Sequence, residues 1–445
     1  MNRRTLAALL AAALSLAAAP MARGDGAFPN SQNIMAPAAL PHEILLGTNF
    51  GLVISVDDGR TWTWSCEQTL NAYAALYQVG PPPANRLYAV SPQGVIRSDD
   101  TACTWSAAAG VGSSAALDVF ADPTDPNRVL TVTTTAPDAG SLYEVLASSN
   151  GAATFGGAIY TAGPDDHITG VEIARSAPQT VYVTLTSGSS FVPKLAQTTD
   201  GGAHWTLHDL SAGLTPGAYS LGLIAVDPAD AQKVYLRVGA PTGEALAITT
   251  DGGASVALPL NLPGGALTAF ARMPSGSLIA AGAVQTDEVA YRSTDGGNGF
   301  QPLPSALPVR GLASRGTTLY AATDTMSTTW AIETSPDEGM TWQPLMAYPD
   351  IQAIQSCVMA VCQDDCEYRA GMDQWPESMC SAVAAPADAG ATPGAGRDAG
   401  PTSPSGKSGC ACATGRAPSA EPWGCLVPLG GLLLCRRRKR GPKRG

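Results

Sequence analysis

Short strings of apolar, β-forming residues recur along most of the chain and are separated by turns rich in Gly, Pro and Asp. Seven such strings begin at residues 42, 85, 127, 179, 232, 276 and 317. Examples are NRLYAV (85–90) and QKVYLR (232–237), and a further string precedes five of the seven, as in LIAVDPAD (223–230). Strings of this length bounded by turn residues are typical of strands, so the pattern predicts an all-β protein.

A related octet follows each of the seven strings. SVDDGRTW begins at Ser55, and similar octets begin at residues 98, 148, 198, 249, 293 and 335. The octets start 42 to 51 residues apart, which leaves room for four strands and their turns. The repeat therefore predicts a single seven-bladed β-propeller of four-stranded blades over residues 25–356.

Two positions of the octet have a physical role in a hairpin. The third residue can accept hydrogen bonds from backbone amides in a tight turn. The eighth residue, usually aromatic, can wedge between neighbouring sheets and bury a large apolar area. The third-position residues are Asp57, Asp100, Asn150, Asp200, Asp251, Asp295 and Asp337, and the aromatic residues are Trp62, Trp105, Phe155, Trp205, Phe300 and Trp342. We assign these residues a structural role.

The octets resemble the Asp-box, or BNR, repeat of sialidases, sortilin-type receptor domains and some glucan-cleaving propellers. The resemblance covers about residues 42–350. It implies that each box forms the hairpin between the third and fourth strands of a blade, away from the ligand face. Ala102 and Ala152 depart from the pattern, because they replace the glycine of the box, and Val256 replaces the aromatic residue.

The two ends of the repeat region decide how the ring closes. Propellers usually close by combining strands from both chain ends in one blade. Two clear strands precede the first box, and IMAPAAL (34–40) is an uncertain third. The segment DIQAIQS (350–356) follows the last blade, and we expect it to supply the missing inner strand.

The charge of the chain is unevenly distributed. The net charge is −11, but it becomes −21 without Arg3, Arg4, Arg23 and the seven basic residues of 436–445. Nucleic-acid binding requires a basic surface, so an acidic body of this kind excludes it as an expected function.

The first 24 residues have the layout of a secretory signal peptide. Arg3 and Arg4 precede an apolar run (6–19), which small residues follow. We therefore expect an exported protein, in which cysteines can form disulfides.

Six cysteines lie in or just after the repeat region. Cys66 and Cys103 belong to neighbouring predicted blades, and we expect them to pair with each other, with two free thiols as the alternative. Cys357, Cys362, Cys366 and Cys380 cluster without a nearby histidine, which favours two disulfides over a zinc site. We expect residues 357–381 to form a small Cys-rich cap on the propeller, and the connectivity within it stays open.

The C-terminal region has two further parts. Residues 382–408 are rich in Pro, Ala and Gly, which is typical of a disordered linker. Residues 409–445 contain Cys410 in a Gly-Cys motif, a short apolar stretch (423–435) and a basic cluster. This order resembles the MYXO-CTERM sorting signal. The resemblance implies cleavage by a sorting protease and anchoring at the cell surface or outer membrane, with Cys410 as the modified residue.

The sequence gives little support to catalysis. The nearest match to the Arg-Ile-Pro motif of sialidases is Arg272-Met273-Pro274, which follows the fifth box instead of preceding the first. Glycosidases need two carboxylates that flank the scissile bond, and no such pair is evident. We expect a non-catalytic binding or scaffold module for a protein or glycan ligand, without a cofactor. The alternative is a secreted glycoside hydrolase of the sialidase-like or glucan-cleaving type.

Five residues are candidates for ligand binding. Asp165, Asp166 and His167 lie in a loop that enters an inner strand, on the face where propeller ligands commonly bind. Phe191 and Trp330 lie in long loops and are candidate exposed anchors. The alternative for the first three is a solvated loop, and for the two aromatic residues it is burial under their own loops. We identify no catalytic or metal-binding candidates.

Overall fold

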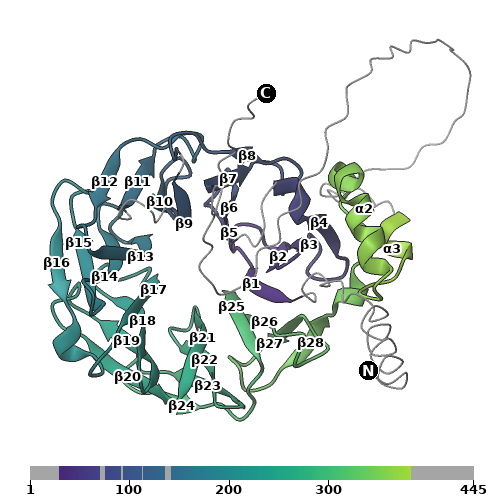
Figure 1. Cartoon of the computed structure of the whole chain (residues 1–445). Helices are drawn as coiled ribbons and strands as arrows, with labels where there is room; N and C mark the ends of the chain where they lie inside the picture. Colours follow the sequence, from purple (N-terminus) through teal and green to yellow (C-terminus); the bar gives the residue numbers. More distant parts are fainter. Residues whose placement is uncertain (1–29, 71–75, 92–93, 113, 136–141, 382–445) are drawn as a thin grey trace, which may run out of the picture. The chain divides into compact units, whose positions relative to one another are not determined.

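Seven antiparallel sheets are arranged around a common centre (Figure 1). The computed structural model describes residues 30–70, 76–91, 94–112, 114–135 and 142–381. The first strand packs against the first strand of the next sheet in six of the seven neighbouring pairs, and Figure 1 shows these strands innermost. The predicted seven-bladed all-β propeller is confirmed. The expected signal peptide, linker and sorting tail, with Cys410, lie outside the described residues.

Each blade is a meander in chain order. The first four blades are β1 (Ser31–Met35), β2 (Ile44–Thr48), β3 (Gly51–Ser55) and β4 (Thr63–Cys66); β5 (Leu76–Val79), β6 (Leu87–Ser91), β7 (Gly94–Ser98) and β8 (Ser106–Ala107); β9 (Ala115–Ala121), β10 (Val129–Thr134), β11 (Tyr143–Ser148) and β12 (Ala158–Thr161); β13 (Asp166–Ile173), β14 (Val181–Ser187), β15 (Val192–Thr198) and β16 (Thr206–Asp209). The last three blades are β17 (Ser220–Val226), β18 (Val234–Ala240), β19 (Gly243–Thr249) and β20 (Ala257–Pro263); β21 (Gly265–Arg272), β22 (Leu278–Val284), β23 (Asp287–Ser293) and β24 (Gln301–Pro302); β25 (Val309–Arg315), β26 (Thr318–Thr323), β27 (Ile332–Ser335) and β28 (Gln343–Met346).

The Asp boxes form the hairpins between the third and fourth strands. In the first box, the Ser55 hydroxyl donates to Asp57 at 2.9 Å and accepts from the Gly59 amide at 2.8 Å. The Asp57 carboxylate also accepts from the Thr61 amide and hydroxyl at 2.9 and 2.6 Å and from the Arg60 amide at 3.1 Å. The same bonds recur in the other boxes with few changes. In the third box, Asn150 accepts from the Thr154 amide at 2.9 Å, so an amide also serves at this position.

The apolar core lies between adjacent blades. The aromatic residue, present in six of the seven boxes, joins the cluster that its blade shares with the preceding blade. Trp205 of the fourth blade, for example, packs with Val132 and Val145 of the third, and the Trp205 indole nitrogen donates to the Ile159 carbonyl at 2.9 Å. Burial of an aromatic side chain between two sheets removes a large apolar area from water, so the boxes hold each blade to its neighbour.

The ring closes differently from the expectation. The inner strand of the first blade is β1, and the following residues 36–40 form a turn instead of a strand. The segment expected to supply that inner strand instead forms β29 (Ala353–Ile354), which pairs in parallel with β4 at the outer edge. Because β1 already completes the first blade, β29 adds a fifth strand to its outside.

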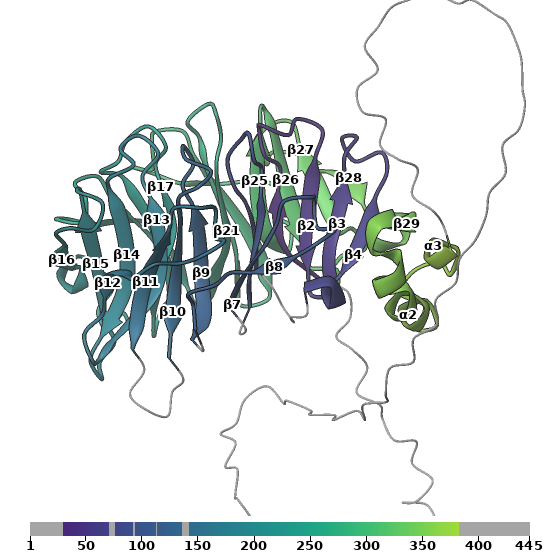
Figure 2. The same ribbon diagram turned by 90° about the horizontal axis from the view of Figure 1, so that it is seen from above.

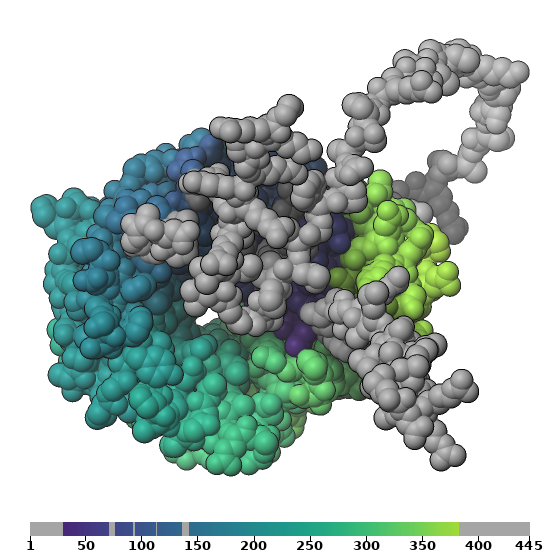
Figure 3. All heavy atoms as spheres, in the orientation of Figure 1, coloured from purple at the N-terminus to yellow at the C-terminus, as the bar shows by residue number. Residues whose placement is uncertain are grey.

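The C-terminal segment after β29 is helical. It comprises η5 (Ser356–Val358), α2 (Met359–Ala370) and α3 (Ser378–Ser381), and it lies at the outer edge of the first blade (Figures 1 and 2). Figure 3 shows these yellow-green helices against the purple first blade. The expected cap is thus attached to the perimeter. Within the described ranges, no helix combines the length and apolar character that a bilayer crossing requires.

Three disulfides join the helical segment to itself and to the propeller. They are Cys66–Cys362, Cys103–Cys357 and Cys366–Cys380. The expected Cys66–Cys103 pair is therefore wrong, and only one disulfide forms within the four-cysteine cluster. The reason is that β29 brings the helical segment to the outer edge of the first two blades, where it offers each of these cysteines a closer partner. We call residues 351–381 the strap.

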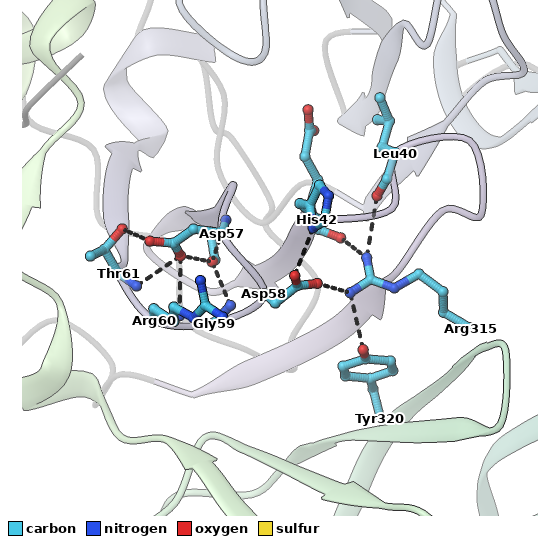
Figure 4. A network of polar contacts seen from close by, with 11 residues as sticks. Leu40, His42, Asp57, Asp58, Gly59, Arg60, Thr61, Arg315 and Tyr320 are labelled. Atoms are coloured by element: carbon cyan, nitrogen blue, oxygen red, sulfur yellow. Dashed lines mark hydrogen bonds and ion pairs between the residues drawn. The ribbon is translucent and has the colours of Figure 1, made fainter. Parts of the chain in front are cut away.

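A polar network joins the first and last blades (Figure 4). Arg315 at the end of β25 donates to the carbonyl oxygens of Leu40 and Glu43 at 3.2 and 2.6 Å. The same guanidinium contacts Asp58 of the first box at 3.1 Å and the Tyr320 hydroxyl at 3.0 Å. One largely buried arginine therefore bridges the seam between the first and last blades, in addition to the pairing of β29 with β4.

Candidate functional site

The two faces of the propeller differ in their exposed side chains. Because the strands of each blade alternate in direction, the Asp boxes share one face, which we call the box face. The hairpins between second and third strands share the opposite face with the connections between blades, and we call it the connector face. Exposed large apolar side chains are more frequent on the connector face: Leu76, Leu142, Phe191, Tyr219, Met326 and Trp330, against Val56 and Met340 on the box face. Single exposed apolar groups are common on proteins, so those that lie close to one another are the informative ones.

Three aromatic rings meet on the connector face, and we call them the aromatic cluster. The His167 ring on β13 lies 5.2 Å from the Tyr143 ring on β11 and 5.8 Å from the Phe191 ring. Phe191 belongs to the tight β14–β15 hairpin and has φ +52°, with its side chain 46% exposed. The hairpin thus holds an aromatic ring out of the core, on a base formed by two blades.

Acidic groups adjoin the aromatic cluster. Asp165 and Asp166 immediately precede His167, and Asp166 accepts from the Gly163 amide at 3.3 Å. Burial and the negative charge of Asp166 raise the pKa of Tyr160, which places that carboxylate near a further aromatic ring. No ion pair among the residues in the structure includes Asp165 or Asp166. Lys194 is engaged elsewhere, since its amine donates to Ser187 at 2.9 Å.

The structure brings four of the five candidate binding residues together. Asp165, Asp166, His167 and Phe191 share the loop side of the fourth blade. Trp330 lies apart, in the β26–β27 connection of the last blade, although it is on the same face. The Trp330 carbonyl accepts a hydrogen bond from the Thr323 hydroxyl. Trp330 is partly exposed, as is Met326 of the same connection.

His167 differs from an ordinary satisfied core histidine. Its Nδ1 atom is buried and has no hydrogen-bond partner in the structure. The same is true of nine other buried side-chain atoms among the described residues, including His208 Nε2. The ring is instead held by its two aromatic neighbours, so packing fixes its orientation.

Two carboxylates near the centre of the ring were not anticipated from the sequence. Asp118 on β9 accepts from the Val171 amide of the next blade at 3.0 Å, and Glu172 on β13 accepts from the Val226 amide at 2.9 Å. Burial raises the pKa of Asp118 to about 6 and that of Glu172 to about 8, and the Asp118 charge adds to the second shift.

These carboxylates connect blades. Gln78 and Glu244 make the same type of contact, each accepting from an inner-strand amide of the following blade at 2.8 Å. A glycosidase pair must be free to protonate the leaving group and to attack or activate water. Asp118 and Glu172 accept from the next blade as Gln78 and Glu244 do, so a structural role accounts for both carboxylates.

A cavity of about 340 Å³ opens between the inner strands β17 and β21. Leu223, Ile224 and Phe270 supply apolar walls, and Arg237 adds a guanidinium. Arg237 is paired with Glu244 at 3.0 Å, so the charge at this wall is balanced. The inner strands bulge at Ile224 and Thr268, and both bulged residues line the cavity.

The box residues form no metal site. Hydrogen bonds from Ser255 lower the pKa of Asp251 to about 2, and the other box aspartates are lowered by similar bonds. Their oxygens are therefore used within the turns. In the part of the chain that the structure describes, no group of three or more His, Cys, Asp or Glu residues could hold a metal ion.

Sequence reasoning missed Tyr143, because it belongs to a neighbouring blade. The sequence suggested sites one loop at a time, whereas this cluster joins β11 of one blade to β13 of the next. The position of Tyr143 in the repeat could have indicated it as a site residue. Tyr143 is the first residue of a third strand and therefore adjoins a hairpin of the connector face.

Comparison with known proteins gives a likeness of fold. No known protein family and no curated protein matches the chain. A GH74 xyloglucanase from Xanthomonas campestris is 14% identical, with a TM-score of 0.40, over 72% of this chain and 59% of the enzyme. The chain thus spans about three fifths of the length of that enzyme. YCF48 from Cyanidioschyzon merolae is 16% identical, with a TM-score of 0.47, over 66% of this chain and 92% of YCF48. A puromycin-hydrolysing peptidase from Mycobacterium tuberculosis is 11% identical, with a TM-score of 0.43, over 73% and 53% of the two chains. These are likenesses of fold alone, and none of the activities of the three proteins is assigned to this chain.

Proposed function

We propose that this chain is a non-catalytic β-propeller that binds a protein or glycan ligand through the aromatic cluster on its connector face. The observation that carries the proposal is the exposed Phe191 ring, held out by its hairpin and packed on His167. Exposed aromatic residues on rigid supports are frequent anchors in binding surfaces, because they contribute contact area at little cost in conformational entropy.

The surrounding charges favour a particular kind of ligand. Asp165 and Asp166 form no ion pair with another described residue, and the chain without its leader and tail carries an excess of acidic residues. A ligand with a positive charge next to an apolar group would match both the carboxylates and the face of an aromatic ring. A basic protein segment or an amino sugar has this chemistry.

An array experiment tests the proposal. The purified exported chain, its Phe191→Ala variant and its Leu207→Ala variant would be applied to glycan and peptide arrays. Leu207 is a matched control, because its side chain is 47% exposed but lies on the outer strand β16. We expect ligands that bind the wild type and Leu207→Ala, but bind Phe191→Ala at least tenfold more weakly, which is about 1.4 kcal/mol. No binding at all would contradict the proposal and favour a scaffold, and equal binding by all three proteins would contradict it because the ligand would then bind elsewhere on the propeller.

The glycoside hydrolase alternative has its own test. Wild type and Glu172→Gln would be assayed with sialyl and β-glucan reporter substrates. The proposal predicts no hydrolysis above the uncatalysed rate. Hydrolysis that Glu172→Gln abolishes, in a variant that remains folded, would replace the binding proposal with the enzymatic one.

We further propose that the protein is exported and held at the cell surface through Cys410, after a sorting protease removes the tail. Support comes from the three disulfides, which are typical of proteins outside the reducing cytosol. Mass spectrometry of the protein from the membrane fraction would show a modified C-terminus at Cys410, and Cys410→Ser would release the protein into the medium. An intact C-terminus ending at Gly445 would contradict this proposal.

A further inference from the structure

The three disulfides differ in their exposure. Cys66 and Cys362 are both 0% exposed, and Cys366 and Cys380 are buried as well. In the third disulfide, Cys357 is exposed and Cys103 is half-buried. Thiol–disulfide exchange requires a thiolate to reach one of the sulfur atoms, so access separates this disulfide from the other two.

The exposed disulfide is attached to an unusual turn. In each Asp box, two successive residues adopt positive φ, and at least one of them is glycine in six of the seven boxes. The second box is the exception, with Thr101 at φ +54° and Ala102 at φ +68°. Positive φ is unfavourable for residues with a side chain, above all for a β-branched residue such as threonine.

The strap holds this turn from outside. Cys103, the next residue, is bonded to Cys357 of the strap. The Gln355 side-chain amide of the strap donates to the Thr101 carbonyl at 3.0 Å. In addition, the Ser65 hydroxyl of the first blade donates to the Ala102 carbonyl at 3.2 Å. Strained backbone conformations persist where the surroundings fix them, and here the disulfide is the covalent part of that support.

We propose that Cys103–Cys357 is a thiol-exchange site, which a small dithiol reduces selectively, and that its reduction loosens the second Asp box while the ring stays closed. A thiolate of the dithiol attacks the Cys357 sulfur, the S–S bond breaks, and Cys103 leaves as a thiolate that takes up a proton. The second thiol of the reductant then displaces Cys357. Two electrons and two protons pass to the protein, and the reductant becomes a cyclic disulfide.

The ring is expected to stay closed because the strap keeps its other attachments. The buried Cys66–Cys362 disulfide remains, and β29 still pairs with β4. The Gln352 side chain also continues to accept from the Trp62 amide at 2.9 Å.

Graded reduction tests the selectivity. Free thiols of the full-length protein would first be blocked with N-ethylmaleimide. The protein would then be treated under native conditions with increasing dithiothreitol, and newly formed thiols would be labelled and mapped by peptide mass spectrometry. We expect Cys103 and Cys357 to be labelled at least about tenfold faster than Cys66, Cys362, Cys366 and Cys380. Labelling of all three pairs at one rate, or of Cys66 and Cys362 first, would overturn the proposal.

Hydrogen exchange tests the consequence for the turn. After selective reduction, amides of residues 98–105 should exchange at least about tenfold faster. The fourth box, residues 198–205, is the internal control, because Gly201 and Gly202 occupy its two positive-φ positions. Unchanged exchange in both boxes would overturn the coupling between disulfide and turn.

A rescue variant separates strain from a general loss of stability. In the Cys103→Ser/Cys357→Ser background, Thr101→Gly/Ala102→Gly should restore slow exchange in residues 98–105, because glycine adopts positive φ without the side-chain penalty. If the glycines leave exchange fast, the turn is not loosened by release of backbone strain and this part of the proposal is wrong.

Discussion

At the scale of single residues, the Asp boxes are explained by their hydrogen bonds. In the seventh box, Asp337 accepts from the Thr341 amide and hydroxyl at 2.8 and 2.7 Å and from the Ser335 hydroxyl at 2.8 Å. Hydrogen bonds lower the pKa of Asp337, chiefly those from Thr341, so the ionised form is the one that holds the turn. Asn150 makes the equivalent backbone contact in the third box without a charge.

This comparison predicts unequal effects of two substitutions. Asp337→Ala removes every one of these acceptors and should lower the free energy of unfolding by about 1 to 2 kcal/mol. Asp337→Asn keeps an acceptor for the Thr341 amide, as Asn150 does for Thr154, and should cost less than half as much. Urea denaturation measures both, and equal losses would show that the charge matters more than the turn geometry.

The raised pKa of Glu172 gives a pH dependence with a definite sign. The carboxyl binds its proton up to about pH 8 in the folded chain, but only up to its ordinary pKa of 4.5 when unfolded. Between these values the folded state holds more protons, so stability falls as pH rises. Glu172→Gln keeps the acceptor for Val226 and removes this loss.

We therefore expect Glu172→Gln to be more stable than the wild type at pH 8, by about 1 to 2 kcal/mol after allowance for partial exposure, and similar to it at pH 5. Thermal unfolding across this range is the measurement. A wild-type stability that rises from pH 5 to pH 8, relative to the variant, would contradict the assignment.

At the scale of elements, the sequence predicted the strands and boxes that recur in every blade well, and it predicted the elements that occur only once poorly. Boxes and middle strands recur seven times, so each copy supports the others. The outer strand β29 occurs once, and it pairs with β4 through residues about 290 positions apart, such as Ala353 and Thr63. Local pattern contains no information about such a contact, which is why the closure and the pairing of Cys66 and Cys103 were predicted wrongly.

The residues of the candidate site likewise fall into those that the sequence predicted and those that it did not. His167 and Phe191 could be proposed from their own loops, because both lie in one blade. Tyr143 could not, because the distance between β11 and β13 is set by how two blades pack. The links made by Asp118 and Glu172 were missed for the same reason, since each joins a side chain to the backbone of the next blade.

The two disulfides between strap and propeller close nearly the same loop. Cys66–Cys362 spans 296 residues and Cys103–Cys357 spans 254. Either one alone restricts the unfolded chain to a similar degree, because the stabilisation depends only on the logarithm of loop length. We expect replacement of one pair by alanine to cost much less than replacement of both, with a coupling of about 1 to 3 kcal/mol in the double-mutant cycle. Additive losses in chemical denaturation would refute this redundancy.

At the scale of the whole molecule, the ring is closed by the C-terminal strand β29, which pairs at the outer edge of the first blade, and by contacts across the seam. The seam between first and last blades depends on Arg315, on packing and on the strap. Arg315→Ala would leave the Leu40 and Glu43 carbonyls without this donor, and we expect a loss of about 2 to 3 kcal/mol. Arg60→Ala is the control on the same face, because Arg60 is exposed and forms no ion pair with another described residue. Equal stabilities of the two variants would show that packing and the strap alone close the seam.

Calorimetric titration of the best array ligand tests the central claim most directly. It would compare the wild type with the variants His167→Ala, Phe191→Ala and Leu207→Ala, after thermal unfolding has shown that each is folded. We predict that His167→Ala and Phe191→Ala each raise Kd at least about tenfold, and that Leu207→Ala leaves Kd within about twofold of the wild type. An unchanged Kd in Phe191→Ala would contradict the account, because the ligand would then bind elsewhere on the propeller.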